Sequence, residues 1–213
     1  MKILLLLLIS LVSLGRSQEL LDKIQPHLGL VFVDYIGMKL PDGSNYFSDS
    51  PGAYFAAISG GVNYVYAHSD DFLSVGIEPN LNFGVRFTDP IGLLVQTPVF
   101  ITAKIGAGAT KFSEGKVGFA LGIGGNFTYV RVPFVNQTTN RTGAVQASFL
   151  SPAVMGELVI NLNNPIGIRF QTNLTTVRTE VDANDSGAGT PNIGGRTDLD
   201  LTNFAVSINY YFP

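Results

Sequence analysis

The sequence predicts an all-β fold: an eight-stranded antiparallel transmembrane β-barrel, an up-and-down meander that follows an N-terminal signal peptide. Apolar residues alternate with small or polar residues over long stretches, and this period of two is that of a strand. The chain is apolar and poor in charge, with a mean hydropathy of +0.27 and 14% charged residues. Yet no stretch after residue 17 has the roughly 18 consecutive apolar residues of a spanning helix. The alternating stretches number eight, and bacterial single-chain barrels have even strand numbers.

The N-terminus has the form of a secretory signal peptide. Met1–Lys2 is a short basic region, Ile3–Leu14 is an apolar run, and Gly15–Ser17 places small residues before a cleavage site at Gln18. The run is shorter than the roughly 20 apolar residues of a membrane-spanning helix. We therefore expect a cleaved signal peptide and a mature chain that starts at Gln18.

The chain is therefore expected to divide into a signal peptide, 1–17, and one outer-membrane β-barrel domain, 18–213. Loss of Lys2 and Arg16 with the signal changes the formal net charge from −3 to −5. Nucleic acid is not an expected partner, since it calls for a basic patch. The chain has no cysteine, which excludes a lipoprotein anchor, disulfides and a thiolate metal site.

The alternation is clearest in residues 72–87. One face there is apolar: Leu73, Val75, Ile77, Leu81, Phe83, Val85 and Phe87. The other face is small or polar: Ser74, Gly76, Glu78, Asn80, Asn82, Gly84 and Arg86. The eight predicted strands are 28–37, 54–67, 72–87, 93–107, 116–131, 149–162, 166–179 and 199–212. Alternation in 28–37 is weak and leaves open which face Val31, Val33 and Tyr35 share.

The connections between these strands differ in length from one end of the barrel to the other. If the N-terminus is periplasmic, the connections on that side, 68–71, 108–115 and 163–165, are short. Those on the outer side include the long segments 38–53, 132–148 and 180–198. Outer-membrane barrels show this asymmetry, so these three segments are expected to be extracellular loops that present a surface.

Alternation alone does not separate a membrane barrel from a soluble, lipocalin-like barrel with its apolar face inward. A soluble exterior would be rich in Lys and Glu, whereas the polar face here is Gly, Ala, Ser, Asn, Thr and Gln. Small polar residues suit a narrow lumen, and large aliphatic residues suit lipid. Aromatic residues near both strand ends resemble two interfacial girdles: Tyr64, Tyr66, Phe72, Tyr210 and Phe212 at one end, and Phe87, Tyr129, Phe134 and Phe149 at the other.

Three prolines argue against uninterrupted strands. Pro79, Pro98 and Pro152 lie inside predicted strands, and each removes one ladder hydrogen bond from a barrel that has no edge. Either bulges absorb them or the strand limits differ.

The chain resembles the small outer-membrane β-barrels of Bacteroidota, the PorT-like family. The resemblance is best from Phe72 to Val130, where Leu94–Ile101 contains a proline and Phe119–Gly125 is glycine-rich. Tyr210 and Phe212 are similar to the C-terminal signal that the barrel-assembly machinery recognises, although Pro213 follows them. The resemblance implies an outer-membrane location and brings no catalytic residues with it.

No catalytic, cofactor-binding or metal site is expected. The two histidines, His27 and His68, both fall at the predicted periplasmic end, away from the outer surface where barrel enzymes place their sites. The informative polar residues are charges on the lumen face: Glu78, Arg86, Lys104, Glu157 and Arg169. Glu157 and Arg169 flank the turn 163–165 as expected diagonal neighbours.

Because buried charges must be paired, these residues are expected to form an ion-pair network that plugs the lumen. The expected function is therefore non-enzymatic, a structural or interaction barrel in contact with outer-membrane lipid and possible partner proteins of the outer membrane. An accessory subunit of a larger complex fits this expectation. Two alternatives stay open: a narrow channel for small solutes, and a soluble binder of a hydrophobic ligand.

Overall fold

The computed structural model describes residues 21–44, 52–86, 91–136, 141–185 and 194–212, and the account below concerns these. The predicted signal peptide and its cleavage site lie outside them. Among the described residues, no helix is long and apolar enough to cross a membrane. The strands are β1 (Ile24–Lys39), β2 (Gly52–Ser69), β3 (Leu73–Arg86), β4 (Gly92–Gly106), β5 (Val117–Asn136), β6 (Arg141–Asn161), β7 (Pro165–Asn173), β8 (Val177–Asp185) and β9 (Gly194–Tyr211).

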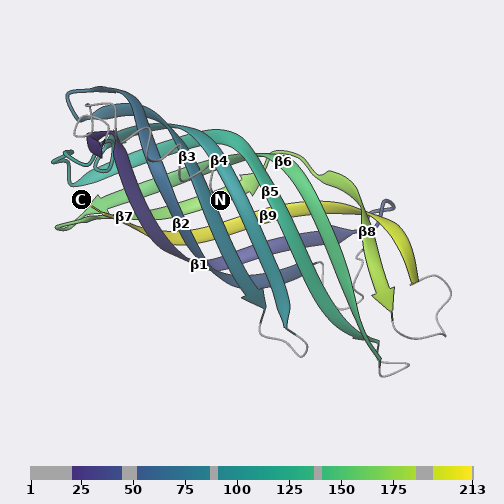
Figure 1. Ribbon diagram of the computed structural model, residues 1–213. Helices are drawn as coiled ribbons and strands as arrows, with labels where there is room; N and C mark the ends of the chain where they lie inside the picture. Colours follow the sequence, from purple (N-terminus) through teal and green to yellow (C-terminus); the bar gives the residue numbers. More distant parts are fainter. Residues whose placement is uncertain (1–20, 45–51, 87–90, 137–140, 186–193, 213) are drawn as a thin grey trace, which may run out of the picture.

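These nine segments form a closed antiparallel barrel of eight strands, because β7 and β8 together make one strand of the barrel (Figure 1). Each strand pairs with the next, and β1 pairs with β9 to close the sheet, from His27 opposite Tyr211 to Lys39 opposite Asp200. β7 and β8 are the two parts of the seventh barrel strand, interrupted at residues 174–176, because both pair with β6 and with β9. The meander predicted from the sequence is confirmed.

Several strands are longer than predicted. β5 and β6 pair as far as Asn136 opposite Arg141, so the segment 132–148 is mainly a β-hairpin and the prediction of a long loop there was wrong. The segment 180–198 likewise contains the end of β8 and the start of β9. Alternation between apolar and polar faces marks only the part of a strand that faces lipid, so the polar extensions escaped the pattern. We call this end of the barrel the hairpin end, and the end where β1 begins and β9 ends the turn end.

A bulge explains the weak alternation in the first strand. The register of β1 shifts between Val31 and Asp34 against β2, and between Val31 and Val33 against β9. Val31 therefore faces the lumen, and so do Asp34 and Ile36, while Tyr35 faces outward. A bulge reverses the inside–outside parity along a strand, which a strict period of two cannot follow.

Pro79 and Pro98 do not lie at bulges, so that explanation was wrong for them, whereas Pro152 borders a two-residue irregularity between β6 and its neighbours β7 and β8. The β2–β3 ladder skips Pro79 and resumes in the same register, and the β3–β4 ladder likewise skips Pro98. Pro152 lies where pairing between β6 and β7 ends, and its carbonyl accepts a hydrogen bond from the Leu174 N–H at 2.9 Å. Each proline thus occupies a local gap in a ladder, where its missing N–H removes a bond without moving a strand.

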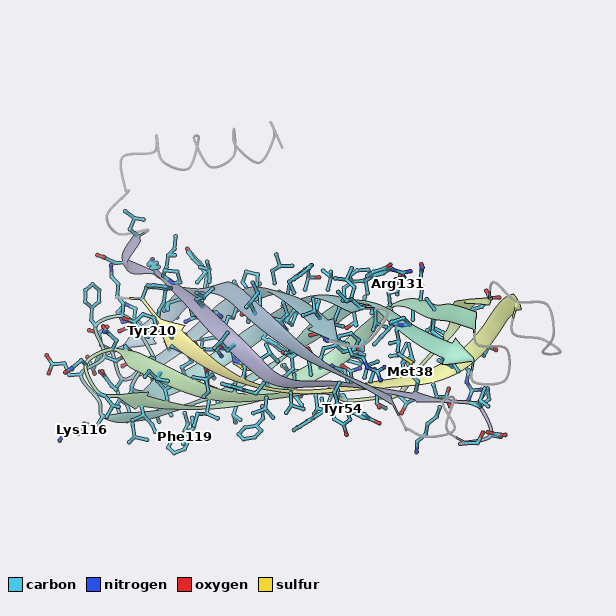
Figure 2. All side chains as sticks on the ribbon, turned by 90° about the horizontal axis from the view of Figure 1, so that it is seen from below. Met38, Tyr54, Lys116, Phe119, Arg131 and Tyr210 are labelled. Carbon is cyan, nitrogen blue, oxygen red and sulfur yellow. The ribbon has the colours of Figure 1, made fainter. Side chains whose placement is uncertain are left out.

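The exterior carries a continuous apolar belt (Figure 2). In β5, for example, the exposed side chains run from Val117 through Phe119 to Phe127. About ten residue steps of about 3.3 Å, on strands tilted by about 40°, give a belt roughly 25 Å tall, the height of the apolar band of outer-membrane barrels. Outward charges among the described residues lie beyond its edges, as at Lys116 and Arg131. A soluble lipocalin-like barrel, which needs its apolar face inward, is excluded.

Candidate functional site

The turn-end half of the lumen contains a buried cluster of ion pairs. Glu78 of β3 lies 2.9 Å from the Lys104 ammonium of β4 and also contacts the Arg169 guanidinium of β7. Arg169 Nη2 lies 3.0 Å from Glu157 Oε2 of β6. All four side chains are within 5% of complete burial. Two carboxylates and two cations balance in charge, which is the condition under which buried ions are tolerated.

Local geometry brings these residues together. Glu157 and Arg169 are direct cross-strand partners across the β6–β7 turn, one step closer than the diagonal relation expected. On the paired strands β3 and β4, which β5 separates from β6, Glu78 lies opposite Phe100 and Lys104 lies opposite Ser74. Because alternate residues share a face, all four side chains enter the lumen, where an eight-stranded barrel is just wide enough for side chains to fill.

Arg86 is the exception among the five predicted network residues. It lies at the last position of β3, half-buried and opposite Gly92, at the hairpin end. The network lies at the other end of the lumen, so a shared face does not bring Arg86 to it.

Four further side chains extend the network and were missed in the sequence. The Tyr211 hydroxyl donates to Glu157 Oε2 at 2.6 Å and accepts from Arg169 Nη2 at 3.0 Å. Asn209 Nδ2 donates to Glu157 Oε1 at 3.2 Å. His27 Nε2 lies 2.6 Å from Asn80 Oδ1 and 3.7 Å from Glu78 Oε1, and the His27 and Tyr211 rings are 5.2 Å apart. Alternation with outward Tyr210 and Phe212 was the signal that could have placed Tyr211 inside.

The middle of the lumen is filled by uncharged polar side chains around one carboxylate. Asp34 accepts hydrogen bonds from Asn203 Nδ2 at 2.7 Å and Gln96 Nε2 at 3.4 Å. Asn82 Nδ2 donates to Gln96 Oε1 at 3.2 Å. Between this layer and Arg169 lies a cavity of about 10 Å³, room for a single water molecule.

The connection between β4 and β5 closes the lumen at the turn end. Ala107 and Ala109 are buried, and Ala107 packs with Val159 and Tyr211 next to the ion pairs. The Ser74 hydroxyl donates to the Ala109 carbonyl, and the segment turns at Gly106 and Gly108, both with positive φ. A segment expected to be a simple periplasmic turn is therefore folded into the barrel mouth.

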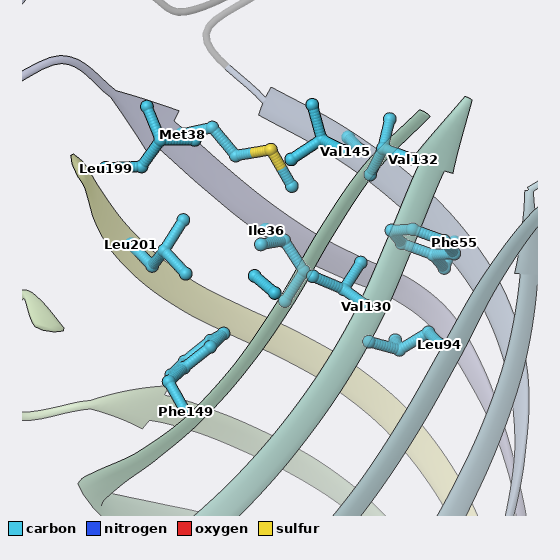
Figure 3. Close-up of a cluster of buried hydrophobic side chains, with 12 residues drawn as sticks. Ile36, Met38, Phe55, Leu94, Val130, Val132, Val145, Phe149, Leu199 and Leu201 are labelled. Carbon is cyan, nitrogen blue, oxygen red and sulfur yellow. The ribbon is translucent and has the colours of Figure 1, made fainter. Parts of the chain in front are cut away.

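The hairpin-end half of the lumen is apolar, which the sequence analysis did not anticipate. Twelve buried side chains form one cluster there (Figure 3). We call it the apolar cap: Ile36, Met38, Ala53, Phe55, Leu94, Val130, Val132, Val145, Ala147, Phe149, Leu199 and Leu201. Phe149, expected in the outer aromatic girdle, is 4% exposed and faces inward, so that assignment was wrong. Outward Leu150 fixes Phe149 on the opposite face.

Other aromatic residues of the predicted girdles do face outward. Tyr66 and Phe72 are exposed at the turn end, and Tyr210 packs edge-on against Phe212 with ring centroids 5.1 Å apart. These last two are the residues of the predicted assembly signal, which stays a prediction. Phe87 and the side chain of Phe134 lie outside the described residues.

Outside the belt, the hairpin end carries exposed charges. Arg178 of β8 donates to both carboxylate oxygens of Asp200 of β9, at 2.7 and 3.1 Å. These hydrogen bonds lower the pKa of Asp200. Among the described residues, no group of three or more His, Cys, Asp or Glu side chains is arranged to hold a metal ion.

Comparisons with known proteins return barrels of the outer membrane at low similarity. Neisserial surface protein A is 8% identical with a TM-score of 0.46, and the match covers 89% of this chain and 97% of that chain. Ail, the attachment invasion locus protein of Yersinia pestis, is 10% identical with a TM-score of 0.44, covering 89% and 99%. The outer membrane protein OprG of Pseudomonas aeruginosa is 12% identical with a TM-score of 0.45, covering 89% and 94%.

No family model matches the chain, and no curated relative matches it. The structural similarities are too low to carry an argument about what the chain does. That argument rests on the barrel's own two faces, the apolar belt outside and the layered lumen inside.

Proposed function

We propose that the chain is a non-enzymatic outer-membrane β-barrel whose lumen is sealed and whose hairpin end presents an interaction surface. The observation that carries the proposal is the apolar belt, roughly 25 Å tall and without outward charges among the described residues. Such a surface is stable only in lipid, since monomeric soluble proteins rarely expose apolar patches of more than a few hundred Å².

The layered lumen supports a sealed barrel rather than a narrow channel. A solute entering from the hairpin end would meet the apolar cap, then the amide layer around Asp34, then the ion pairs of Glu78 and Glu157. The folded β4–β5 connection lies behind them. A buried ion-pair network that fills the lumen is costly to open, because each charge would lose its partner.

The turn end is assigned to the periplasm and the hairpin end to the cell exterior, in line with short inner turns and long outer hairpins. The PorT-like resemblance supports a place among the outer-membrane proteins of Bacteroidota, and the signal-like segment 1–17 supports export. The resemblance also supports a role as an accessory subunit that a larger outer-membrane complex contacts at the hairpin end. The outward pair Tyr210 and Phe212 supports delivery by the barrel-assembly machinery.

The test is heat modifiability combined with conductance. Protein extracted from membranes in mild detergent is run on a gel with and without boiling, and is then reconstituted in planar bilayers. A closed barrel should migrate faster unboiled, and a sealed lumen should give no conductance steps. A soluble protein without a mobility shift would refute the membrane placement. Reproducible steps would instead support the narrow-channel alternative.

A further inference from the structure

The pairing between β6 and its neighbours β7 and β8 is interrupted over six residues. β6 pairs with β7 from Asn161 to Ala153 and with β8 from Gln146 to Gly143. Between them, Ala147–Pro152 has no register partner in the described residues of β7 or β8, and the hydrogen bond from the Leu174 N–H to the Pro152 carbonyl crosses the interruption at its turn-end edge. We call this interruption the seam, formed by Ala147–Pro152 on one side and Leu174–Val181 on the other.

The seam results from two extra residues in the seventh barrel strand, which β7 and β8 form together. Ala147–Pro152 is six residues long, whereas Leu174–Val181 is eight. The same excess is found against β9, where Thr172 pairs with Phe204 and Val177 with Leu201. Pro152 adds to it, since it has no N–H to donate across the seam. Only Thr202 and Asn203 of β9 lie between these two pairs, so the interruption is shorter on the β9 side than on the β6 side.

The seam begins at the outer edge of the apolar belt, at Leu150 and Leu174, and extends beyond it to Arg178. On its other side, β6 pairs Leu150 with Phe127 of β5, and both are exposed on the lipid face. Leu150 is 69% exposed and Leu174, across the seam, is 51% exposed. Backbone groups in lipid must find partners inside the protein, so an interrupted ladder is costly there.

Behind the seam lies the apolar cap. Ala147 and Phe149 of β6 and Leu201 of β9 belong to it, and Val177 of β8 packs against it. At Leu150 and Leu174 the wall therefore separates lipid from an apolar interior, and the exposed Arg178–Asp200 pair lies further toward the hairpin end. The route down the lumen is blocked by the ion pairs and the folded β4–β5 connection.

We propose that the seam is a lateral gate through which small uncharged apolar molecules, aliphatic or aromatic, pass between the apolar cap and the outer leaflet. The cap lacks charges, which favours uncharged ligands. Its side chains include Met38, whose unbranched thioether chain adapts to a guest (Figure 3). This proposal rests on the membrane placement proposed above, and the two are separated by the experiment below.

The gate can be closed by a deletion that the register defines. Removing Thr175 and Thr176 takes out the two extra residues, so β8 can continue the register of β7 against both neighbours. Because two residues are removed, every inward side chain stays inward. The deletion should leave the belt, the cap and the ion pairs in place.

A single tryptophan reports whether a guest reaches the cap, because the chain has none. F149W places the probe in the cap beside the seam. F119W places it on the lipid face, and F100W places it in a separate buried cluster of the lumen. The three variants are reconstituted in phosphatidylcholine vesicles and titrated with 1-bromooctane, an apolar quencher that dissolves in the bilayer.

We expect F119W and F149W to lose most of their emission while F100W is spared, and F149W to be protected once Thr175 and Thr176 are deleted. A spared F149W in the full-length chain, or equal quenching with and without the deletion, would overturn the gate. If the deletion does not give a heat-modifiable barrel, P152A offers a milder closure that restores one ladder donor. Lack of quenching in F119W, with no heat modifiability, would refute the membrane placement instead.

Discussion

Glu157 contacts two other strands of the barrel with one carboxylate. It pairs with Arg169 of β7 at 3.0 Å and accepts hydrogen bonds from Tyr211 and Asn209 of β9. Together these contacts connect β6 to β7 and to β9, the last two strands of the barrel. A residue in this position contributes to closure as well as to filling the lumen.

The variant E157Q keeps the shape of this side chain and removes its charge. Arg169 would then share Glu78 with Lys104, leaving positive charge in excess, and breaking a buried pair costs about 3 kcal/mol. We expect the urea midpoint in detergent micelles to fall accordingly, with no rise in planar-bilayer conductance. R178Q, which removes an exposed ion pair at the hairpin end, serves as control and should leave the midpoint unchanged. A clear gain of conductance in E157Q would contradict the sealed lumen.

Sequence reasoning at this scale succeeded where the period of two was enough. The inward parity of Glu78, Lys104, Glu157 and Arg169 could be read directly, but their assembly depends on strand stagger, which alternation does not give. Arg86 shows this limit, because it shares the lumen face of Glu78 but lies at the hairpin end of the barrel, away from the ion pairs. The apolar cap had a readable signal in β5, where inward positions change from small or polar residues to Val130 and Val132.

The β4–β5 connection depends on backbone conformations that only glycine adopts easily. Gly106 has φ +75°, and a Cβ there would collide with the Val117 carbonyl oxygen. Gly43 has φ +85° with nothing within 4 Å of such an atom. The two glycines therefore share the same conformational demand and differ only in crowding.

The loss of unfolding free energy should differ between the variants G106A and G43A. Positive φ alone costs a non-glycine residue about 1 kcal/mol, which is what G43A should lose. G106A should lose at least about 2 kcal/mol, because the collision adds to the strain. Thermal unfolding followed by the gel shift measures both. Equal losses would mean that the connection relaxes away from Val117 and does not hold the lumen closed.

The elements themselves were predictable in number and order, and less so in length. The lipid belt imposes alternation on each strand, so the belt portions could be located from sequence. Beyond the belt the outward face is no longer apolar while the inward face becomes so at Val132 and Val145, so the alternation ends, and 132–148 was read as a loop for that reason. The bulge in β1 and the interruption at residues 174–176 were hidden because each changes local register without changing composition.

For the molecule as a whole, orientation is the property that assigns a compartment to each end. Lys39 lies at the hairpin end and Lys116 at the turn end, and both side chains are exposed. The chain has no cysteine, so K39C and K116C each carry a single thiol. In intact cells a membrane-impermeant maleimide should label K39C and leave K116C unlabelled until the outer membrane is permeabilised. The reverse pattern would place the β4–β5 connection outside the cell.

The pairing of β1 with β9 has a consequence for how the chain matures. The partners Leu28 and Tyr210 lie in the first and the last strand, so the last ladder cannot form until β9 has been synthesised. Until then both terminal strands are open edges, which are templates for pairing with other chains. Contacts this distant in sequence also form slowly. The nascent protein must therefore travel unfolded and be shielded from its own copies, and any truncation that removes β9 yields an aggregation-prone sheet rather than a smaller barrel.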